Sequence, residues 1–184
     1  MPDLTGTTIA FLATDAVEQA ELTGPWNAAK DAGATVHLVS TVDEVQGFNH
    51  LDKADTFPVD RQVSDVNPSV YDALVLPGGV ANPDALRMDA GAVAFAKSFL
   101  EADKVVAAIC HAPWLLVEAD AVHGRQVTSW PSLETDLANA GASWVDEQVV
   151  VDTNGPGTLI TSRNPDDIPA FSKTLIDELS SRAA

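Results

Sequence analysis

The feature that most constrains the fold is an alternation of short apolar runs with helical patterns. The apolar runs predict buried strands at residues 8–13, 35–39, 72–77 and 104–109, and the helical patterns predict helices at 17–31 and 90–102. A connection between parallel strands has to cross a face of the sheet, and a helix usually makes that crossing. The sequence therefore predicts an α/β fold with a mostly parallel central sheet covered on both faces, in one domain over residues 1–184.

Glycine, proline and asparagine predict where several elements begin, bend or end. Gly33 is expected to end the first helix, and Pro25 to kink or interrupt it. Residues 41–68 are less regular and are expected to hold short strands or a hairpin. Asn82 is expected to cap a helix whose first residue is Pro83.

The last third of the chain continues the same pattern. Ser132 is expected to cap a helix that ends at Gly141. Residues 148–152 and 158–161 predict two paired strands, and Asn164 opens an amphipathic C-terminal helix.

Cys110 is the single cysteine, and it lies between the buried strand at 104–109 and a predicted helix. A sharp turn from strand to helix holds the intervening side chain at the carboxyl edge of the sheet, as a nucleophile elbow does. Such a turn needs small neighbours, and Ala108 and Ala112 stand two residues to either side. His111 follows directly, and an imidazole can take a thiol proton or stabilise a thiolate. A buried, inert cysteine is the alternative, but these neighbours favour a reactive thiol held ionised.

Two further strand ends supply candidate partners for Cys110. Glu18 and Glu21 are three residues apart in the first predicted helix, and a protonated Glu21 can donate a hydrogen bond to a thiolate. From the pattern alone, two solvated first-turn acids are the simpler interpretation. Gly78 and Gly79 follow the strand at 72–77 and can offer a backbone N–H, together with that of His111, to a developing oxyanion.

Charge and cysteine usage exclude several classes of function. The formal net charge of −17 argues against nucleic acid and against anionic membrane surfaces as partners. A single cysteine forms no internal disulfide, and the N-terminus shows no signal peptide, so a cytoplasmic location is expected. His37, His50 and His123 are isolated and show no metal-ligand spacing, so neither a metal nor a cofactor is expected.

The segments 76–79 and 107–113 resemble the ThiJ/PfpI family of the class I glutamine amidotransferase-like superfamily. The likeness continues through residues 128–131, 139–142, 144–146, 149–152 and 161–163, and so covers essentially the whole chain. The resemblance implies a flavodoxin-like three-layer sandwich with Cys110 as the nucleophile. It also implies that Glu21 hydrogen-bonds the thiol, with Glu18 nearby.

The Cys-His pair resembles the PfpI-type branch, whose peptidases complete a triad with an acid from a neighbouring subunit. Asp84 is the nearest match, although its side chain is shorter than the family's glutamate and an extra residue precedes it. The resemblance also implies that Trp130 contributes to the oxyanion or substrate site, at a position where members of the family often have a tyrosine. This branch implies a homo-oligomer, either a dimer or a hexamer.

Three functions remain open from the sequence. The first is a stress-response cysteine hydrolase that acts on reactive carbonyls, as glyoxalase III-like enzymes or protein deglycases do. The second is an intracellular cysteine peptidase. The third is a non-enzymatic protein whose thiol senses oxidants. Aldehyde addition needs mainly a thiolate and a proton donor, which favours the first.

Overall fold

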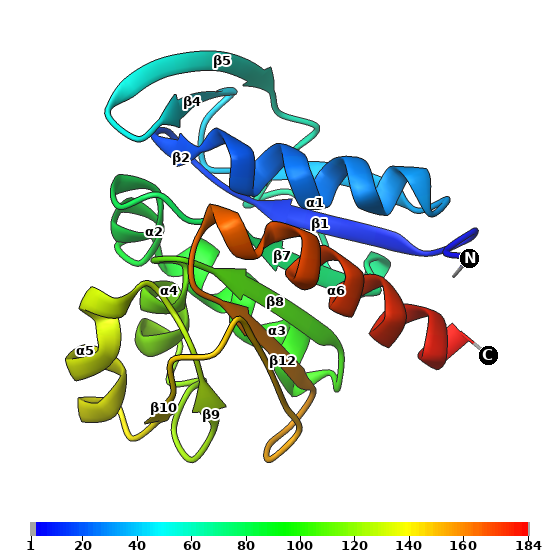
Figure 1. Ribbon diagram of the computed structural model, residues 1–184. Coiled ribbons are helices and arrows are strands. Elements are labelled where there is room, and N and C mark those ends of the chain that lie inside the picture. Colours follow the sequence, from blue (N-terminus) through cyan, green and yellow to red (C-terminus); the bar gives the residue numbers. More distant parts are fainter. Residues whose placement is uncertain (1–2, 184) are drawn as a thin grey trace.

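A seven-stranded sheet forms the centre of the structure, and helices cover both of its faces (Figure 1). The computed structural model describes residues 3–183, so Met1, Pro2 and Ala184 of the predicted domain lie outside the described residues. The strand order is β11-β12-β8-β7-β1-β3-β6. These strands are β1 (Thr8–Leu12), β3 (Thr35–Ser40), β6 (Arg61–Gln62), β7 (Ala73–Leu76), β8 (Val105–Ile109), β11 (Val149–Asp152) and β12 (Thr158–Ser162).

The pairing of the strands confirms the predicted sheet. β11 runs antiparallel to β12, and the other neighbouring pairs of this sheet are parallel. The helices form the two outer layers. On one face lie α1 (Gln19–Asp31) and α6 (Ile168–Ala183), and on the other lie α2 (Ala81–Leu86), α3 (Ala90–Glu101), α4 (Pro113–Glu118) and α5 (Glu134–Asn139). The predicted three-layer α/β sandwich is therefore confirmed.

β8 lies in the middle of the sheet, and each of its residues is buried. Its side chains alternate between the two layers: Val106 and Ala108 belong to the core cluster shared with α3 and α4, whereas Val105, Ala107 and Ile109 belong to the one shared with α1 and α6. The carboxyl end of β8 is thus held from both sides by packed side chains.

A hairpin lies beside the main sheet and confirms the expectation for residues 41–68. β4 (Glu44–Asn49) and β5 (Asp52–Pro58) pair antiparallel, and the short β2 (Val17–Glu18) adds to them as a third strand. Figure 1 shows this hairpin projecting over the start of α1. A separate two-stranded sheet consists of β9 (Gln126–Val127) and β10 (Ser143–Trp144).

The first helix differs from its predicted bounds. Val17 and Glu18 pair with β4 as an extended segment, so α1 begins only at Gln19. Pro25 lies inside α1 without interrupting it, contrary to one of the two expected effects.

Two predicted helix caps are wrong because tertiary contacts claim their side chains. α2 already begins at Ala81, so Asn82 lies inside its first turn and its side chain reaches the ends of two strands. Ser132 lies in a 3₁₀ turn before α5, and its hydroxyl lies 3.5 Å from Nε2 of His111.

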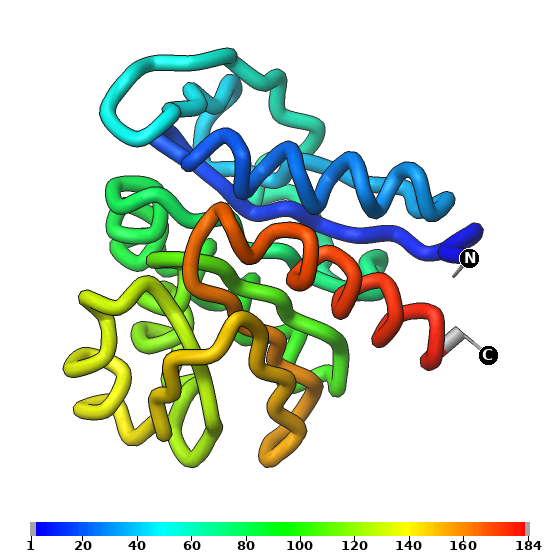
Figure 2. Tube along the Cα trace, in the orientation of Figure 1, coloured from blue at the N-terminus to red at the C-terminus, as the bar shows by residue number. Residues whose placement is uncertain are grey.

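The first and last described residues lie at the same end of the molecule (Figure 2). They occupy the edge of the sheet opposite the one where β8 ends. These two residues are therefore remote from Cys110.

Candidate active site

Cys110 occupies the predicted elbow between β8 and α4. Its φ of 64° lies in the left-handed region, which a residue with a Cβ adopts at a cost of roughly 1–3 kcal/mol. The backbone around it is fully engaged: its N–H donates to the carbonyl of Ser162 at 3.0 Å, and its carbonyl accepts from the N–H of Trp130 at 2.9 Å. Ala112 on the far side of the turn is 1% exposed. The elbow is thus confirmed, and its strained residue is the one that carries the thiol.

His111 faces the thiol. Its Nδ1 lies 3.1 Å from Sγ of Cys110, and both residues are buried. The ring stacks on Trp130 at 5.6 Å between centroids and makes an edge contact with Trp114 at 5.3 Å. Burial lowers the pKa of His111, so the imidazole is neutral at neutral pH and one ring nitrogen can accept a proton.

Glu21 is completely buried in the first turn of α1, which corrects the solvated interpretation. Its Oε2 accepts a hydrogen bond from the N–H of Gly78 at 2.9 Å, whereas its Oε1 has no partner among the described residues. Burial raises the pKa of Glu21 to about 8, with a further contribution from the charge of Glu18, and contact with Cys110 opposes that rise. Glu21 therefore holds a proton at neutral pH and can donate it toward the sulfur.

The thiol of Cys110 is less easily ionised than the sequence suggests. Burial raises its pKa, and an ionised Glu21 raises it further, while the N–H groups of Gly79 and His111 act in the opposite direction. Glu21 raises the pKa of Cys110 through its charge and through its hydrogen bond to the thiol, and both contributions require the carboxylate form. Once Glu21 is protonated, the same group becomes a hydrogen-bond donor to sulfur. A thiolate therefore forms only while Glu21 keeps its proton.

Gly78 and Gly79 leave no room for a side chain. A Cβ on Gly78 would lie 2.5 Å from Oε2 of Glu21 and 2.7 Å from Cβ of Cys110. Gly79 has a φ of 81°, and its Cβ would lie 2.7 Å from the carbonyl oxygen of Ala16. The glycine pair allows the loop to approach the acid and the sulfur closely enough for its N–H groups to reach both.

Asn82 holds this glycine loop in place. Its Oδ1 accepts the N–H of Thr14 at 2.7 Å, and its Nδ2 donates to the carbonyls of Pro77 and Gly78 at 2.9 and 3.0 Å. The residue is 0% exposed. It joins the end of β1 to the end of β7, a role that its local sequence does not signal.

A cavity of about 380 Å³ opens in front of Cys110. Glu18, Glu21, Gly79, His111 and Trp130 all line it, so the structure brings these predicted residues together. Most of its other lining residues are apolar, namely Ala16, Phe48, Leu51, Val80, Ala81 and Pro165.

His50 and Asp84 differ in how they relate to the cavity. His50, which the sequence leaves isolated, lies at the tip of the β4–β5 hairpin and lines the cavity, with its N–H donating to Oε2 of Glu18 at 3.0 Å. Asp84 lies on the exposed side of α2 and is not among the lining residues. Within one chain, the structure does not bring Asp84 to His111.

Neither a metal centre nor a membrane-spanning helix is found within residues 3–183. No three His, Cys, Asp or Glu side chains of this range are arranged to hold a metal ion. No helix of the same range has the length and apolar character needed to cross a membrane.

Comparison with known proteins relates the whole site region to one family. Residues 7–178 match the model of the DJ-1/PfpI family. General stress protein 18 of Bacillus subtilis (strain 168) is 43% identical over 170 residues, which cover 91% of this chain and 95% of that protein. Protein/nucleic acid deglycase 2 of Escherichia coli (strain K12) is 41% identical over 167 residues, covering 90% and 93%. YraA of the same Bacillus strain, named as a candidate cysteine protease, is 41% identical over 173 residues, covering 93% and 97%.

Proposed function

The chain belongs to the DJ-1/PfpI family, and from that premise we propose that it is a cysteine hydrolase of reactive carbonyl compounds. The activity is of the glyoxalase III or protein deglycase type, serves a stress response and needs no cofactor. One observation carries the proposal: an elbow thiol contacts Nδ1 of His111 at 3.1 Å, beside a fully buried Glu21 whose Oε1 has no partner within residues 3–183. A thiol, a proton acceptor and a proton donor then surround one small cavity.

The proposed reaction with methylglyoxal begins with addition of Sγ of Cys110 to the aldehyde carbon. The thiol proton passes through Nδ1 of His111 to the aldehyde oxygen, which gives a hemithioacetal. His111 then removes the proton from that carbon while Glu21 donates its proton to the keto oxygen. His111 returns its proton to the former keto carbon, and Glu21 regains a proton from the hydroxyl on the former aldehyde carbon, giving a lactate thioester. Water hydrolyses the thioester to lactate and the free thiol. The sum is methylglyoxal plus water to lactate, with no oxidant or reductant.

The test is to incubate the purified protein with methylglyoxal and measure lactate, with Cys110→Ser as the matched control. The wild-type protein is expected to form lactate at a rate that the serine variant does not approach. Equal rates in the two proteins would reject the proposal. A second assay follows removal of methylglyoxal adducts from arginine and separates deglycase from glyoxalase activity.

A cysteine peptidase is the second candidate, and the name of YraA favours it. Nδ1 of His111 lies against the thiol, and Nε2 approaches Ser132 at 3.5 Å, so no carboxylate of residues 3–183 hydrogen-bonds this imidazole. Asp84 on the exposed side of α2 is the candidate acid in a homo-oligomer. Peptide hydrolysis that survives Asp84→Asn, or a strictly monomeric protein in sizing chromatography, would count against this candidate.

A further inference from the structure

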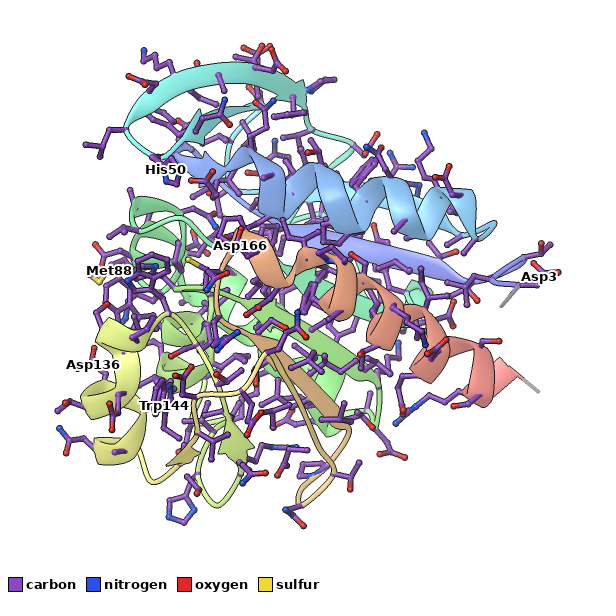
Figure 3. The ribbon with its side chains drawn as sticks, viewed as in Figure 1. Asp3, His50, Met88, Asp136, Trp144 and Asp166 are labelled. Carbon is purple, nitrogen blue, oxygen red and sulfur yellow. The ribbon has the colours of Figure 1, made fainter. Side chains whose placement is uncertain are left out.

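One wall of the cavity comes from the β4–β5 hairpin rather than from the main sheet. Phe48, His50 and Leu51 line the cavity from the end and tip of this hairpin. Figure 3 shows His50 at the tip, on the side that faces α2. Leu51 is 93% exposed although it borders the cavity, so its own chain offers it almost no packing. An apolar side chain in this position is available to a bound molecule.

The charged lining of the cavity, His50 and His111 aside, is acidic. Of the described residues that line it, none is lysine or arginine, whereas Glu18 and Glu21 both contribute a carboxyl group. Burial lowers the pKa of His111, which removes that imidazole as a cation at neutral pH. Glu21 keeps its proton because burial raises its pKa to about 8. Apart from His50, which also lines the cavity, the fixed charge of the cavity is therefore that of Glu18.

Glu18 is held at this place by the hairpin itself. Its Oε2 accepts the N–H of His50 at 3.0 Å, and its backbone is paired with Phe48 in the parallel β2–β4 ladder. The charge of Glu18 acts inside the cavity, since it contributes to the raised pKa of Glu21. An incoming anion meets that charge, and the net charge of −17 on the chain acts in the same direction.

We propose that this cavity selects uncharged carbonyl compounds with an apolar substituent and rejects anionic ones. Glu18 is the residue that repels anions, and Phe48 and Leu51 form the wall against which the substituent packs. Among the reactive carbonyl compounds of the proposed function, the cavity thus favours neutral ones over oxo acids and phosphorylated carbonyl compounds. Turnover of this class rests on the proposed function, but the selection of neutral over anionic reagents at Cys110 does not.

The charge selection is tested by alkylation of Cys110 with two reagents of similar size, neutral iodoacetamide and anionic iodoacetate. Cys110 is the single cysteine, so the intact mass reports its modification alone. Each rate is divided by the rate of the same reagent with a small free thiol. The normalised preference for iodoacetamide is expected to reach about tenfold or more, and Glu18→Gln to reduce it about threefold to fivefold. Glutamine keeps an acceptor for His50, so the hairpin remains attached.

Asp52→Asn is the matched control, because Asp52 is an exposed acid next to Leu51 that does not line the cavity. It removes the same charge from the same hairpin and is expected to leave the preference at its wild-type value. Equal normalised rates in the wild-type protein would overturn the proposal. An equal loss of preference in Glu18→Gln and Asp52→Asn would also overturn it, since the whole surface would then be responsible.

The apolar wall is tested with Leu51→Ser, a change at a side chain too exposed to affect folding. The ratio of kcat/KM for phenylglyoxal to that for methylglyoxal is expected to fall about fivefold, since a phenyl ring loses more apolar contact than a methyl group. An unchanged ratio would remove Leu51 from the proposal. If the wild-type protein turns over neither compound, the proposed function fails, while the alkylation preference still decides the charge selection.

Discussion

The cavity has two walls of opposite construction. The wall that carries Cys110 grows out of β8, whose residues are all buried between two layers of helices. The hairpin wall has few buried residues, with Val45 and Gly47 buried in β4 and none in β5. The chemistry thus lies on the part of the molecule that the core holds rigid, and the part that selects what enters lies where local change costs little.

The attachment of the two walls differs in kind as well. Asn82, completely buried, ties the glycine loop to two strands through three hydrogen bonds. The side-chain contacts that tie the hairpin to α1 are exposed, since the side chain of Gln19 accepts the N–H of Asp55 at 2.8 Å and donates to its carboxylate at 2.9 Å. Water can replace the exposed contacts of Gln19, but it does not reach the buried contacts of Asn82.

The largest expected effect is on turnover, and it comes from Cys110→Ser in the wall that β8 holds rigid. A serine hydroxyl fits the same elbow but is a far weaker nucleophile than a thiol or thiolate, so carbonyl turnover is expected to fall at least about a thousandfold. Lactate formation measures the activity, and thermal unfolding checks that the fold is kept. Residual turnover above about a tenth of the wild-type rate would show that another group attacks the substrate.

Glu21→Gln is expected to lower turnover and to raise stability at the same time. Burial raises the pKa of Glu21 from 4.5 to about 8, so the folded protein binds a proton that the unfolded chain releases between these values. The contribution of Glu21 to stability therefore falls as pH rises from about 4.5 to 8, by about 1.4 kcal/mol per pH unit. Glutamine does not titrate, so at pH 7 the variant is expected to be more stable by roughly 3 kcal/mol.

Urea unfolding of both proteins at pH 4, 6 and 7 measures this difference. The gain in stability is expected to vanish at pH 4, where both the folded and the unfolded wild-type chain hold the proton. Asp52→Asn is the matched control, since Asp52 is exposed and does not line the cavity. A gain that is independent of pH would show that packing, and not the proton, accounts for it.

Gly79→Ala tests the close approach of the glycine loop to the segment that precedes α1. Alanine at a φ of 81° is strained, and its Cβ would lie 2.7 Å from the carbonyl oxygen of Ala16. Gly124 is the control, because it has a φ of 74° and its Cβ would meet no atom within 4 Å. Gly79→Ala is expected to lower the free energy of unfolding by about 2 kcal/mol more than Gly124→Ala. Equal losses would mean that the conformation alone requires glycine at position 79.

The rigid wall is also the part that the sequence predicts well. The strand at 104–109, the turn at Cys110 and the small residues Ala108 and Ala112 all leave local signals, and the structure confirms the elbow. The alternation of strands and helices predicts the sheet for the same reason. Each signal depends on neighbours along the chain, and a residue pattern records such neighbours directly.

The contacts that complete the site are not local, and the sequence misplaces them. Asn82 before Pro83 has the pattern of a helix cap, yet its partner Thr14 lies 68 residues away. His50 reaches the cavity only because the hairpin folds back over α1, and no neighbour of His50 indicates this. Glu21 has the pattern of a solvated first-turn acid. Its side chain is buried against Gly78 and Cys110, which follow β7 and β8, and the family resemblance implies this contact while the residue pattern does not.

The smallest expected effect on stability, that of Gln19→Ala, separates the behaviour of the two cavity walls most clearly. Gln19→Ala removes both side-chain contacts to Asp55, which is exposed and can bind water instead, so the global free energy of unfolding is expected to fall by at most about 1 kcal/mol. The hairpin, in contrast, loses an attachment and should open more often. Hydrogen exchange is expected to accelerate severalfold in residues 44–58 and to stay unchanged in residues 105–112. If both segments accelerated equally, the hairpin and the elbow would open as one cooperative unit, and the distinction between a rigid wall and a selective wall would not hold.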